Sequence, residues 1–255
     1  MKKQNILRKY LSIYRFHAAY GTLEGIRRSF AIFLEIDLFD FRYRVNTRTI
    51  KAQALQKVTY MPYWPCFTSV ARKMIKHSHN YYISAIRYSD LNRKTVFIDF
   101  GSGLGKTIII AAETKKFNLC YGIEIDNDLV TESMRNLKKY KSSDVLDSVF
   151  NVKGNIESEN SIKELVTKLS NKGYNSDNTT LFIFNKNSYG PDVLEQSLML
   201  IQKYFHSIVY LYQNPIHKNS LVNQGFLEFG TDDKGSEAHK NYKYALYFKH
   251  NYSIT

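Results

Sequence analysis

A turn rich in glycine follows an apolar run that ends in Asp99, and a second apolar run ends in another acidic residue, Glu124. The turn contains Gly101, Ser102, Gly103 and Gly105. Such a turn lets a ligand approach the main chain closely, and a parallel neighbouring strand would place Glu124 beside it. A carboxylate there can accept hydrogen bonds from both hydroxyls of a ribose. The spacing therefore predicts a site for a nucleoside-containing cofactor.

Three known glycine patterns compete for this turn. A dinucleotide turn, G-x-G-x-x-G, needs its third glycine one residue later than Gly105. A P-loop matches from Gly105 onward but has Phe100 at its first glycine position, and the later strand LFIF is followed by Asn185 where the usual aspartate would stand. The pattern D-x-G-x-G-x-G is matched in full from Asp99 onward. The plain alternative is a glycine turn that only joins a strand to a helix.

Longer segments around the turn point to a family. TVFIDFGSGLGKTIIIAAE and YGIEIDNDLVTESMRNLKKY resemble bacterial class I methyltransferases that use S-adenosylmethionine. Other similar segments are FDFRYRVNT, the Y-x-P at Tyr60, LFIFNKNSYG and IVYLYQNPIHKNSLVNQGF. The resemblance runs from Phe39 to the C-terminus, to an uncharacterised branch often linked to surface-polysaccharide genes. It implies a methyltransferase with S-adenosyl-L-methionine as its cofactor.

The resemblance also implies which residues hold that cofactor. Asp99 would orient its ammonium group and Glu124 would bind its ribose, while Asn155 and Ile156 would meet its adenine. The full cofactor-binding set is Tyr60, Asp99, Gly101, Ser102, Gly103, Gly105, Glu124, Asn155 and Ile156. Asn155 fits equally well as a plain turn residue, and Tyr60 as a packing anchor. Lys106, in the first turn of the following helix, is expected to face solvent.

The candidate catalytic residues are Asn185, Tyr189 and His217. An asparagine at the end of the fourth strand can accept a hydrogen bond from an amine and so direct its lone pair toward the methyl group. Tyr189 would form the wall of the acceptor pocket. His217 would serve as a base for a hydroxyl acceptor, because an imidazole titrates near neutrality, although a lone histidine after a strand is more often structural.

These residues support two classes of enzyme. The first methylates a hydroxyl or amine of a small-molecule or glycan-type acceptor. The alternative is a protein lysine N-methyltransferase, because the non-SET histone lysine methyltransferases share the D-x-G-S-G-x-G loop and a later G-P-E, here Gly190-Pro191-Asp192. The aromatic residues that would line its lysine channel are Trp64, Phe184, Tyr189 and Tyr212. A binding module that keeps the fold without catalysis is the non-enzymatic alternative.

Strands and helices are expected to alternate from residue 95 onward. The expected strands are 95–100, 119–124, 148–153, 181–185 and 206–213, followed by a hairpin of 226–230 and 242–249. The expected helices are 105–116, 127–140, 159–171, 190–203 and 217–224. This order predicts an α/β, Rossmann-like class I methyltransferase fold. Its sheet would be seven-stranded and mostly parallel, with a C-terminal antiparallel hairpin and an N-terminal helical extension.

The first part of the chain differs in charge from the rest. Residues 1–90 carry 16 Lys and Arg against 5 Asp and Glu, whereas residues 91–255 carry 20 against 18. We expect a basic, mainly helical region over the cleft in residues 1–90 and the methyltransferase core in residues 91–255. Its helices are expected at 3–20, 22–36, 48–56 and 67–78. The excess charge either serves solubility alone or faces an anionic partner.

The acceptor is expected to be a small molecule, a glycan or a protein. If the basic region of residues 1–90 binds the acceptor, the acceptor is expected to carry an anionic group. Nucleic acid is not favoured, because Asn185 lacks the prolines of N-P-P-[YF]. An amphipathic helix at 3–20, with Leu7 and Leu11 on its apolar face, either packs on its own domain or contacts an anionic membrane.

Two cysteines, Cys66 and Cys120, have no metal-ligand spacing, and no metal is expected. Their small number is typical of a reducing compartment. No apolar run is long enough to span a membrane. We therefore expect a cytoplasmic protein. If the helix at 3–20 contacts the membrane, the protein would be peripheral to its inner face.

Overall fold

The structure is a computed structural model that describes residues 21–48, 65–85, 92–140, 148–186, 189–232 and 243–250. Three expected features lie outside these residues: the helix at 3–20, nearly all of the helix at 48–56, and Tyr60. No helix within the described ranges has the length and apolar character needed to cross a membrane.

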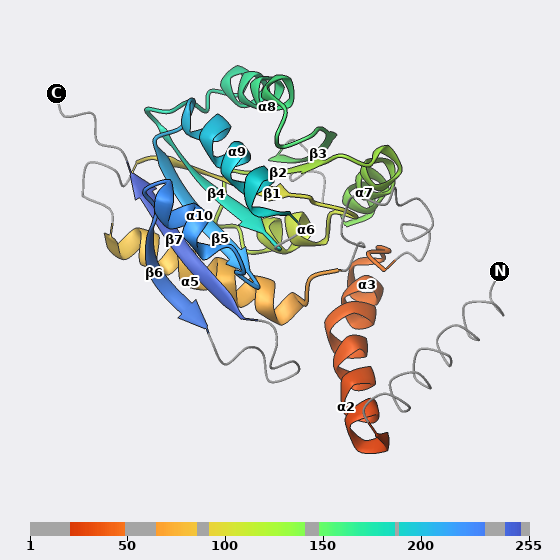
Figure 1. Ribbon diagram of the computed structural model, residues 1–255. Coiled ribbons are helices and arrows are strands. Elements are labelled where there is room, and N and C mark those ends of the chain that lie inside the picture. Colours follow the sequence, from red (N-terminus) through yellow and green to blue (C-terminus); the bar gives the residue numbers. More distant parts are fainter. Residues whose placement is uncertain are drawn as a thin grey trace.

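Seven described strands form one sheet through the centre of the molecule (Figure 1). They are β1 (Lys94–Phe100), β2 (Leu119–Glu124), β3 (Val149–Lys153), β4 (Thr179–Asn185), β5 (Ser207–Gln213), β6 (Leu227–Asp232) and β7 (Tyr244–His250). Their order is β3-β2-β1-β4-β5-β7-β6, parallel from β3 to β5, with β7 antiparallel to both of its neighbours. The expected Rossmann-like sheet with its terminal antiparallel pair is confirmed.

Helices cover both faces of this sheet (Figure 1). The helices α5 (Thr68–Ala85), α6 (Lys106–Glu113) and α7 (Asn127–Tyr140) share one apolar core with alternate strand residues such as Phe97 and Phe182. The helices α8 (Glu159–Asn171), α9 (Pro191–Gln202) and α10 (Lys218–Asn223) share the other core with the intervening strand residues. Because successive strand residues point to opposite faces, a strand buried on both faces is apolar throughout. For that reason the expected strands agree with the structure to within two residues at each end.

The N-terminal helical segment runs further than its sequence predicted. The expected helix at 22–36 is instead α2 (Thr22–Ile32), the π-helix η1 (Phe33–Asp37) and α3 (Leu38–Tyr43), in unbroken succession. Ile36 and Phe39 are buried in the core, so packing against the body carries the helix past its expected end. In the same way α5 continues beyond residue 78, where Tyr82 is buried and hydrogen-bonded to Thr180.

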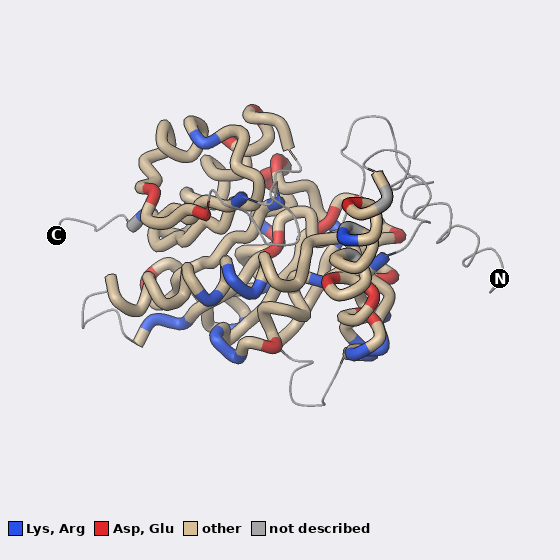
Figure 2. The backbone as a smooth tube through the Cα atoms, turned by 90° about the horizontal axis from the view of Figure 1, so that it is seen from below, with Lys and Arg blue, Asp and Glu red and all other residues tan. Residues whose placement is uncertain are grey.

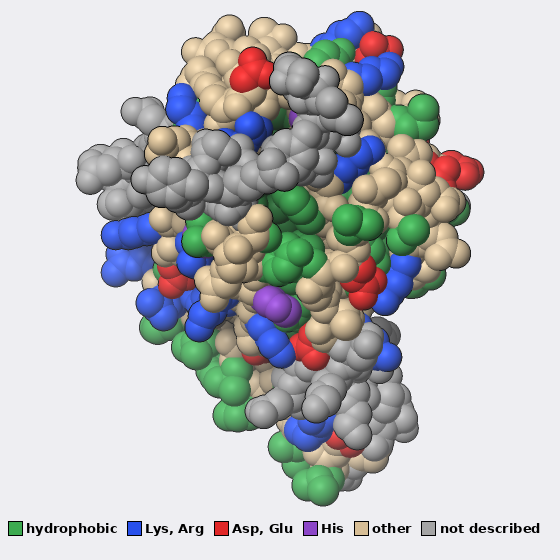
Figure 3. Space-filling model, turned by 90° about the vertical axis from the view of Figure 1, so that its left-hand side faces the viewer, with side chains coloured by type: hydrophobic (Ala, Val, Ile, Leu, Met, Phe, Trp, Pro, Cys, Tyr) green, Lys and Arg blue, Asp and Glu red, His purple; other side chains and the backbone are tan. Residues whose placement is uncertain are grey.

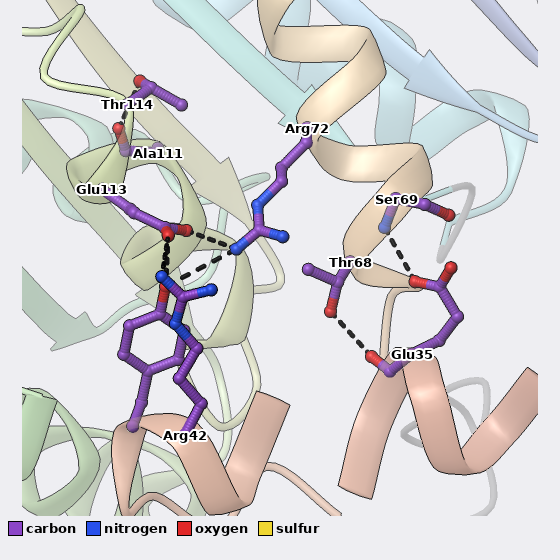
Figure 4. Close-up of polar contacts among 9 residues, drawn as sticks. Glu35, Arg42, Thr68, Ser69, Arg72, Ala111, Glu113 and Thr114 are labelled. Atoms are coloured by element: carbon purple, nitrogen blue, oxygen red, sulfur yellow. Dashed lines mark hydrogen bonds and ion pairs between the residues drawn. The ribbon is translucent and has the colours of Figure 1, made fainter. Parts of the chain in front are cut away.

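Polar contacts join these helices to the core (Figure 4). Arg72 of α5 donates to the carboxylate of Glu113 on α6 at 2.6 Å. At the other end of the view, the carboxylate of Glu35 accepts a hydrogen bond from the Ser69 amide, and its carbonyl accepts one from the Thr68 hydroxyl, both at 2.7 Å. These bonds hold η1 against the first turn of α5.

Candidate functional site

The glycine turn after β1 is held against the end of β2 by main-chain bonds. The amides of Gly101 and Ser102 both donate to the carbonyl of Ile123, at 2.9 and 3.1 Å. All three glycines of the turn have positive φ, 75° at Gly101, 51° at Gly103 and 80° at Gly105. Only glycine adopts such angles without strain, so the sequence D-x-G-x-G-x-G and this compact turn require each other.

Glu124, at the end of β2, closes the turn from the side. Its carboxylate accepts hydrogen bonds from the main-chain amides of Gly103, at 2.8 Å, and Asp126, at 3.0 Å. Glu124 is buried, and burial raises the pKa of its carboxyl group, although these amides act against the rise. The predicted meeting of Glu124 with the glycine turn is therefore present, with the carboxylate already bonded to the turn.

Asp99, at the end of β1, is also buried. Burial raises the pKa of its carboxyl group well above the ordinary value, and the nearby charge of Glu124 raises it further. A hydrogen bond from the Thr107 side chain and the ammonium of Lys186 act in the opposite direction. Two buried carboxyl groups that repel each other in this way would be stabilised by a bound cation or by hydrogen-bond donors of a ligand.

Beneath the turn lies a buried polar contact that the sequence did not reveal. The hydroxyl of Ser102 donates to the side-chain oxygen of Asn151 on β3 at 2.7 Å, while the Asn151 amide nitrogen is buried and has no hydrogen-bond partner among the described residues. A Cβ atom at Gly122 would lie 2.7 Å from that same oxygen. Glycine at position 122 therefore lets the Ser102 and Asn151 side chains lie close to the main chain of β2. The apolar run around Asn151 gave no signal of this role.

Asn136 of α7 is a second residue that sequence reasoning missed. Its amide nitrogen donates to the carbonyl of Leu104 within the glycine turn, at 3.1 Å, and to the carbonyl of Asn46 at 2.9 Å. Its side-chain oxygen accepts the Asn46 amide in return, also at 2.9 Å. One buried asparagine therefore ties the turn to the segment that follows α3.

Tyr189 lies directly on the turn. A Cβ atom built on Gly101 would stand 2.3 Å from the Tyr189 hydroxyl, so the phenol occupies the space that only a glycine leaves open. Tyr189 is half-buried and follows β4 closely. The structure thus brings an expected acceptor-side residue into contact with an expected cofactor-side residue.

Asn185 ends β4, next to the end of β1, where its register partner is Phe100. It is buried, and its amide nitrogen donates to the hydroxyl of Tyr210 on β5 at 2.9 Å. The next residue, Lys186, is partly buried, and burial lowers the pKa of its ammonium to about 8. This ammonium lies 3.4 Å from the Pro65 carbonyl. The sequence showed Lys186 only as a departure from a proline motif.

His217 is connected to this cluster through its main chain. Its amide donates to the hydroxyl of Tyr212 at 3.4 Å. The Tyr212 ring packs edge-on against Tyr210, the partner of Asn185, with 6.0 Å between the ring centroids. His217 therefore lies at the outer end of a chain of contacts that leads to Asn185, and it precedes the first turn of α10.

Asn155 and Ile156 follow β3. The Asn155 side-chain oxygen accepts the Glu157 amide at 3.1 Å, which forms a local turn before α8. Ile156 is buried in the core shared with α8 and α9. Both positions have a structural role here, and their part in adenine binding stays a prediction.

Lys106 does not face solvent, and that expectation was wrong. It is buried, with its ammonium bonded to the carbonyl of Glu35 and 4.9 Å from the ring centroid of Phe39. Burial lowers the pKa of the ammonium to about 8. The helical segment that contains η1 covers this position, which the local sequence around Lys106 gave no means to foresee. An ammonium directed toward η1 is also not held as a P-loop lysine would be.

Cys66 and Cys120 are free and buried. The Cys66 thiol donates to the side-chain oxygen of Gln213 at 3.1 Å, and burial raises its pKa to about 11. Within the described ranges no three His, Cys, Asp or Glu side chains are grouped so as to hold a metal ion.

The site therefore combines a narrow glycine turn, two buried carboxyl groups and the buried Asn151 amide, which has no partner in the described part of the chain. Such a donor set fits a ligand that carries a cation together with hydroxyl groups. The end of β4 adds Asn185 on the other side of the turn, with Lys186 and Tyr189 shortly after it in the chain. Ligands of open parallel sheets bind at these carboxyl ends of the strands.

A family model agrees with this location. The model described as "Histone methylation protein DOT1" matches residues 76–196, just under half of the 255-residue chain. The matched segment begins within α5, contains the glycine turn and Asn185, and ends within α9. No curated protein shows significant similarity to the chain.

Several solved methyltransferase structures are similar in outline. Magnesium protoporphyrin IX methyltransferase (ChlM) from Synechocystis PCC 6803, with bound SAM, is 11% identical over 88% of this chain and 97% of its own, with a TM-score of 0.47. The methyltransferase domain of bacterial CtHen1-C is 10% identical over 72% and 100%, with a TM-score of 0.48. M. capricolum TrmK, in complex with S-adenosyl-homocysteine, is 13% identical over 69% and 66%, with a TM-score of 0.44.

Proposed function

We propose that the chain is a methyltransferase that uses S-adenosylmethionine and methylates a hydroxyl or amine of a small-molecule or glycan-type acceptor. The observation that carries the proposal is the joining of the glycine turn to Glu124, with the buried carboxyl of Asp99 beside it. The family match over residues 76–196 supports methyl transfer, without bearing on this acceptor.

The described residues fit this cofactor. Asp99 would accept a hydrogen bond from its ammonium group, and the positive charge would lower the cost of holding two carboxyl groups in one buried place. Glu124 would exchange part of its bonding to Gly103 and Asp126 for the ribose hydroxyls. When bound, the cofactor supplies a methyl group already activated on a sulfonium sulfur. The chain has to align the acceptor and remove its proton.

On the acceptor side, the proposal assigns alignment to Asn185 and Tyr189. Asn185 is fixed by Tyr210, and Tyr189 rests on Gly101, so both side chains are positioned before any acceptor arrives. Lys186 is the better candidate for the base than His217. Its ammonium interacts with Asp99, whereas the described bond of His217 is made by its main chain. A lysine with a pKa near 8 is partly neutral at mildly alkaline pH and can then accept a proton.

The second candidate function is a protein lysine N-methyltransferase. The match to the family described as "Histone methylation protein DOT1" favours it. The proposed aromatic channel has less support, because Phe184 and Tyr212 are buried in the two cores of the molecule. Tyr189 is the described aromatic residue that remains half-exposed beside the turn, and Trp64 lies outside the described residues.

Calorimetry with S-adenosylmethionine, its demethylated product and ATP with Mg²⁺ tests the cofactor. Binding of the first two at micromolar concentrations, without binding of ATP, is the expected result. Binding of ATP alone would overturn the proposal. Incubation with methyl-labelled cofactor and fractionated extract then tests the acceptor. Label in small molecules or glycans supports the first candidate, label on protein lysines supports the second, and label in nucleic acid contradicts both.

A further inference from the structure

The helix α2 exposes its apolar side chains instead of burying them. Leu23 is 85% exposed and Phe30 60% exposed, and Ile26 and Leu34 on the same helical face are also exposed. Their spacing of three and four residues places them in one line along the helix. A surface helix normally turns such a line toward the core.

The line continues through the π-helix into α3. There Leu38 and Phe41 are exposed, Phe41 to 83%. The wider turn of the π-helix η1 changes the spacing between outward-facing residues. Leu34, Leu38 and Phe41 therefore continue the line of apolar side chains that begins on α2. We call these six residues the apolar stripe: Leu23, Ile26, Phe30, Leu34, Leu38 and Phe41.

Residues off the stripe make the contacts with the body. Ala31, Ile36 and Phe39 are buried, and Glu35 holds the start of α5. Figure 1 shows α2 projecting away from the sheet, and in Figure 3 green side chains appear on the lower, projecting part of the molecule together with blue ones. A contiguous exposed apolar patch of this kind marks an interaction surface.

Charge identifies the partner. Figure 2 shows acidic and basic positions interleaved near α2 and α3, but the acidic groups there are already bonded. The bonded pairs are Glu24–Arg27, Asp37–Arg48, Asp40–Thr47 and, through the main-chain amide of serine, Glu35–Ser69. Arg42, next to Phe41 on the stripe, pairs with Glu113 at 3.7 Å, yet 66% of its side chain remains exposed, and Arg44 is also exposed.

The preceding sequence adds charge of the same sign. Residues 1–20 contain five basic residues, Lys2, Lys3, Arg8, Lys9 and Arg15, and no acidic residue. Apolar side chains in a line, with a surplus of Lys and Arg close by in the sequence, are the features of helices that lie in the interface of an anionic membrane. A second copy of the chain would bring the same positive charge against this surface and so fits it less well.

We propose that the apolar stripe of α2, η1 and α3 inserts into the interface of an anionic lipid membrane. The rest of the molecule would then be held beside the membrane by the projecting helices. The inference does not depend on the methyl-transfer chemistry, since it rests on a different surface.

Flotation of the full chain with vesicles tests the proposal. Vesicles of phosphatidylglycerol and phosphatidylcholine should carry the protein, and vesicles of phosphatidylcholine alone should carry much less. Phe30→Asp should lower the partition coefficient by about tenfold or more, because it replaces the insertion of a phenyl ring by that of a charge. Met199→Asp is the matched control, since Met199 is exposed on α9 far along the chain from the stripe; it should leave partition unchanged.

Raised salt should weaken binding, since the attraction of lysine and arginine to anionic lipid is screened. Light scattering without lipid measures the molar mass of the protein and so tests the competing explanation, in which the apolar stripe forms a dimer interface. The proposal is overturned if the vesicles that contain phosphatidylglycerol fail to bind the protein, or if Phe30→Asp and Met199→Asp bind them equally well. It is also overturned if the protein forms a dimer that Phe30→Asp disrupts while these vesicles stay unbound. Far-ultraviolet circular dichroism of each variant verifies that folding is retained.

Discussion

The carboxylate of Glu124 accepts a hydrogen bond from the main-chain amide of Gly103 at 2.8 Å, which joins the end of β2 to the turn that follows β1. The same carboxylate also accepts the amide of Asp126, so it braces two loops at once. A residue in this position affects both the stability of the turn and its capacity to bind a ligand. The two effects can be separated by experiment.

Glu124→Gln should weaken the binding of S-adenosylmethionine by about tenfold to a hundredfold, because hydrogen bonds to a charged acceptor contribute about 1.5–3 kcal/mol. Calorimetry measures the dissociation constant, and thermal unfolding measures the loss of stability. Glu132→Gln is the control, since that carboxylate pairs with Arg135 on the surface of α7 and should change neither quantity. Equal affinities of the two variants would remove Glu124 from the cofactor site.

Gly101→Ala should destabilise the protein by about 1–3 kcal/mol, because an alanine at φ 75° is strained and its Cβ meets the Tyr189 hydroxyl. Adding Tyr189→Phe should recover part of this loss by removing the oxygen that clashes. Gly190→Ala is the control, since Gly190 has φ −67° and open space around its Cβ. Chemical denaturation measures all four proteins, and a similar loss in both single glycine variants would contradict the prediction.

Lys106 should make the stability of the protein depend on pH. Burial lowers the pKa of its ammonium to about 8 in the folded state, whereas the unfolded chain keeps the ordinary value of 10.5. Between these values the unfolded state binds more protons, so the free energy of unfolding rises with pH, by up to about 1.4 kcal/mol per unit. Below pH 8 the ammonium is charged in both states and its burial cost is fully present.

Relative to Lys106→Met, the wild-type protein should therefore gain about 2 kcal/mol of stability between pH 7 and pH 9.5. Denaturant titrations at several pH values measure the difference, and the upper limit avoids the titration of tyrosines. Lys203→Met, at an exposed lysine, should show no such change relative to the wild type. A flat difference across the range would mean that Lys106 is solvated.

Asn185→Ala should lower methyl transfer by about tenfold to a hundredfold while cofactor affinity stays within about threefold, if Asn185 aligns the acceptor. Tyr210→Phe should act in the same direction but less strongly, since it removes the oxygen that fixes the Asn185 amide. Label incorporation and calorimetry give the two quantities. Loss of cofactor affinity without a further loss of turnover would place Asn185 on the cofactor side of the site.

The sheet could be predicted because each of its buried strands is a continuous apolar run with a turn at its end. The run from Val96 to Phe100, followed by glycines with positive φ, defines both the strand and the turn. Glu124 could be placed beside that turn because parallel strands end at the same edge. The local order of residues carries this information without any knowledge of distant contacts.

The contacts between distant segments could not be predicted in the same way. Lys106 and Glu35 are 71 positions apart, and Ser102 and Asn151 are 49 apart, so neither pairing leaves a mark on the local pattern. A lysine in the first turn of a helix ordinarily faces water, and only the covering segment at η1 changes that. The extension of the N-terminal helix past residue 36 has the same cause, since Ile36 and Phe39 find their partners in the body.

The helix α5 lies among the first ninety residues, yet Val70, Met74 and Ile75 pack into the same core as Phe182 of β4 and Val209 of β5. A recombinant chain shortened to begin at residue 91 would uncover the part of that side of the sheet that α5 covers and expose it to water. Such a truncated protein would aggregate through the exposed apolar surface. The step in charge near residue 90 is therefore a change in composition and not a place at which the molecule can be cut.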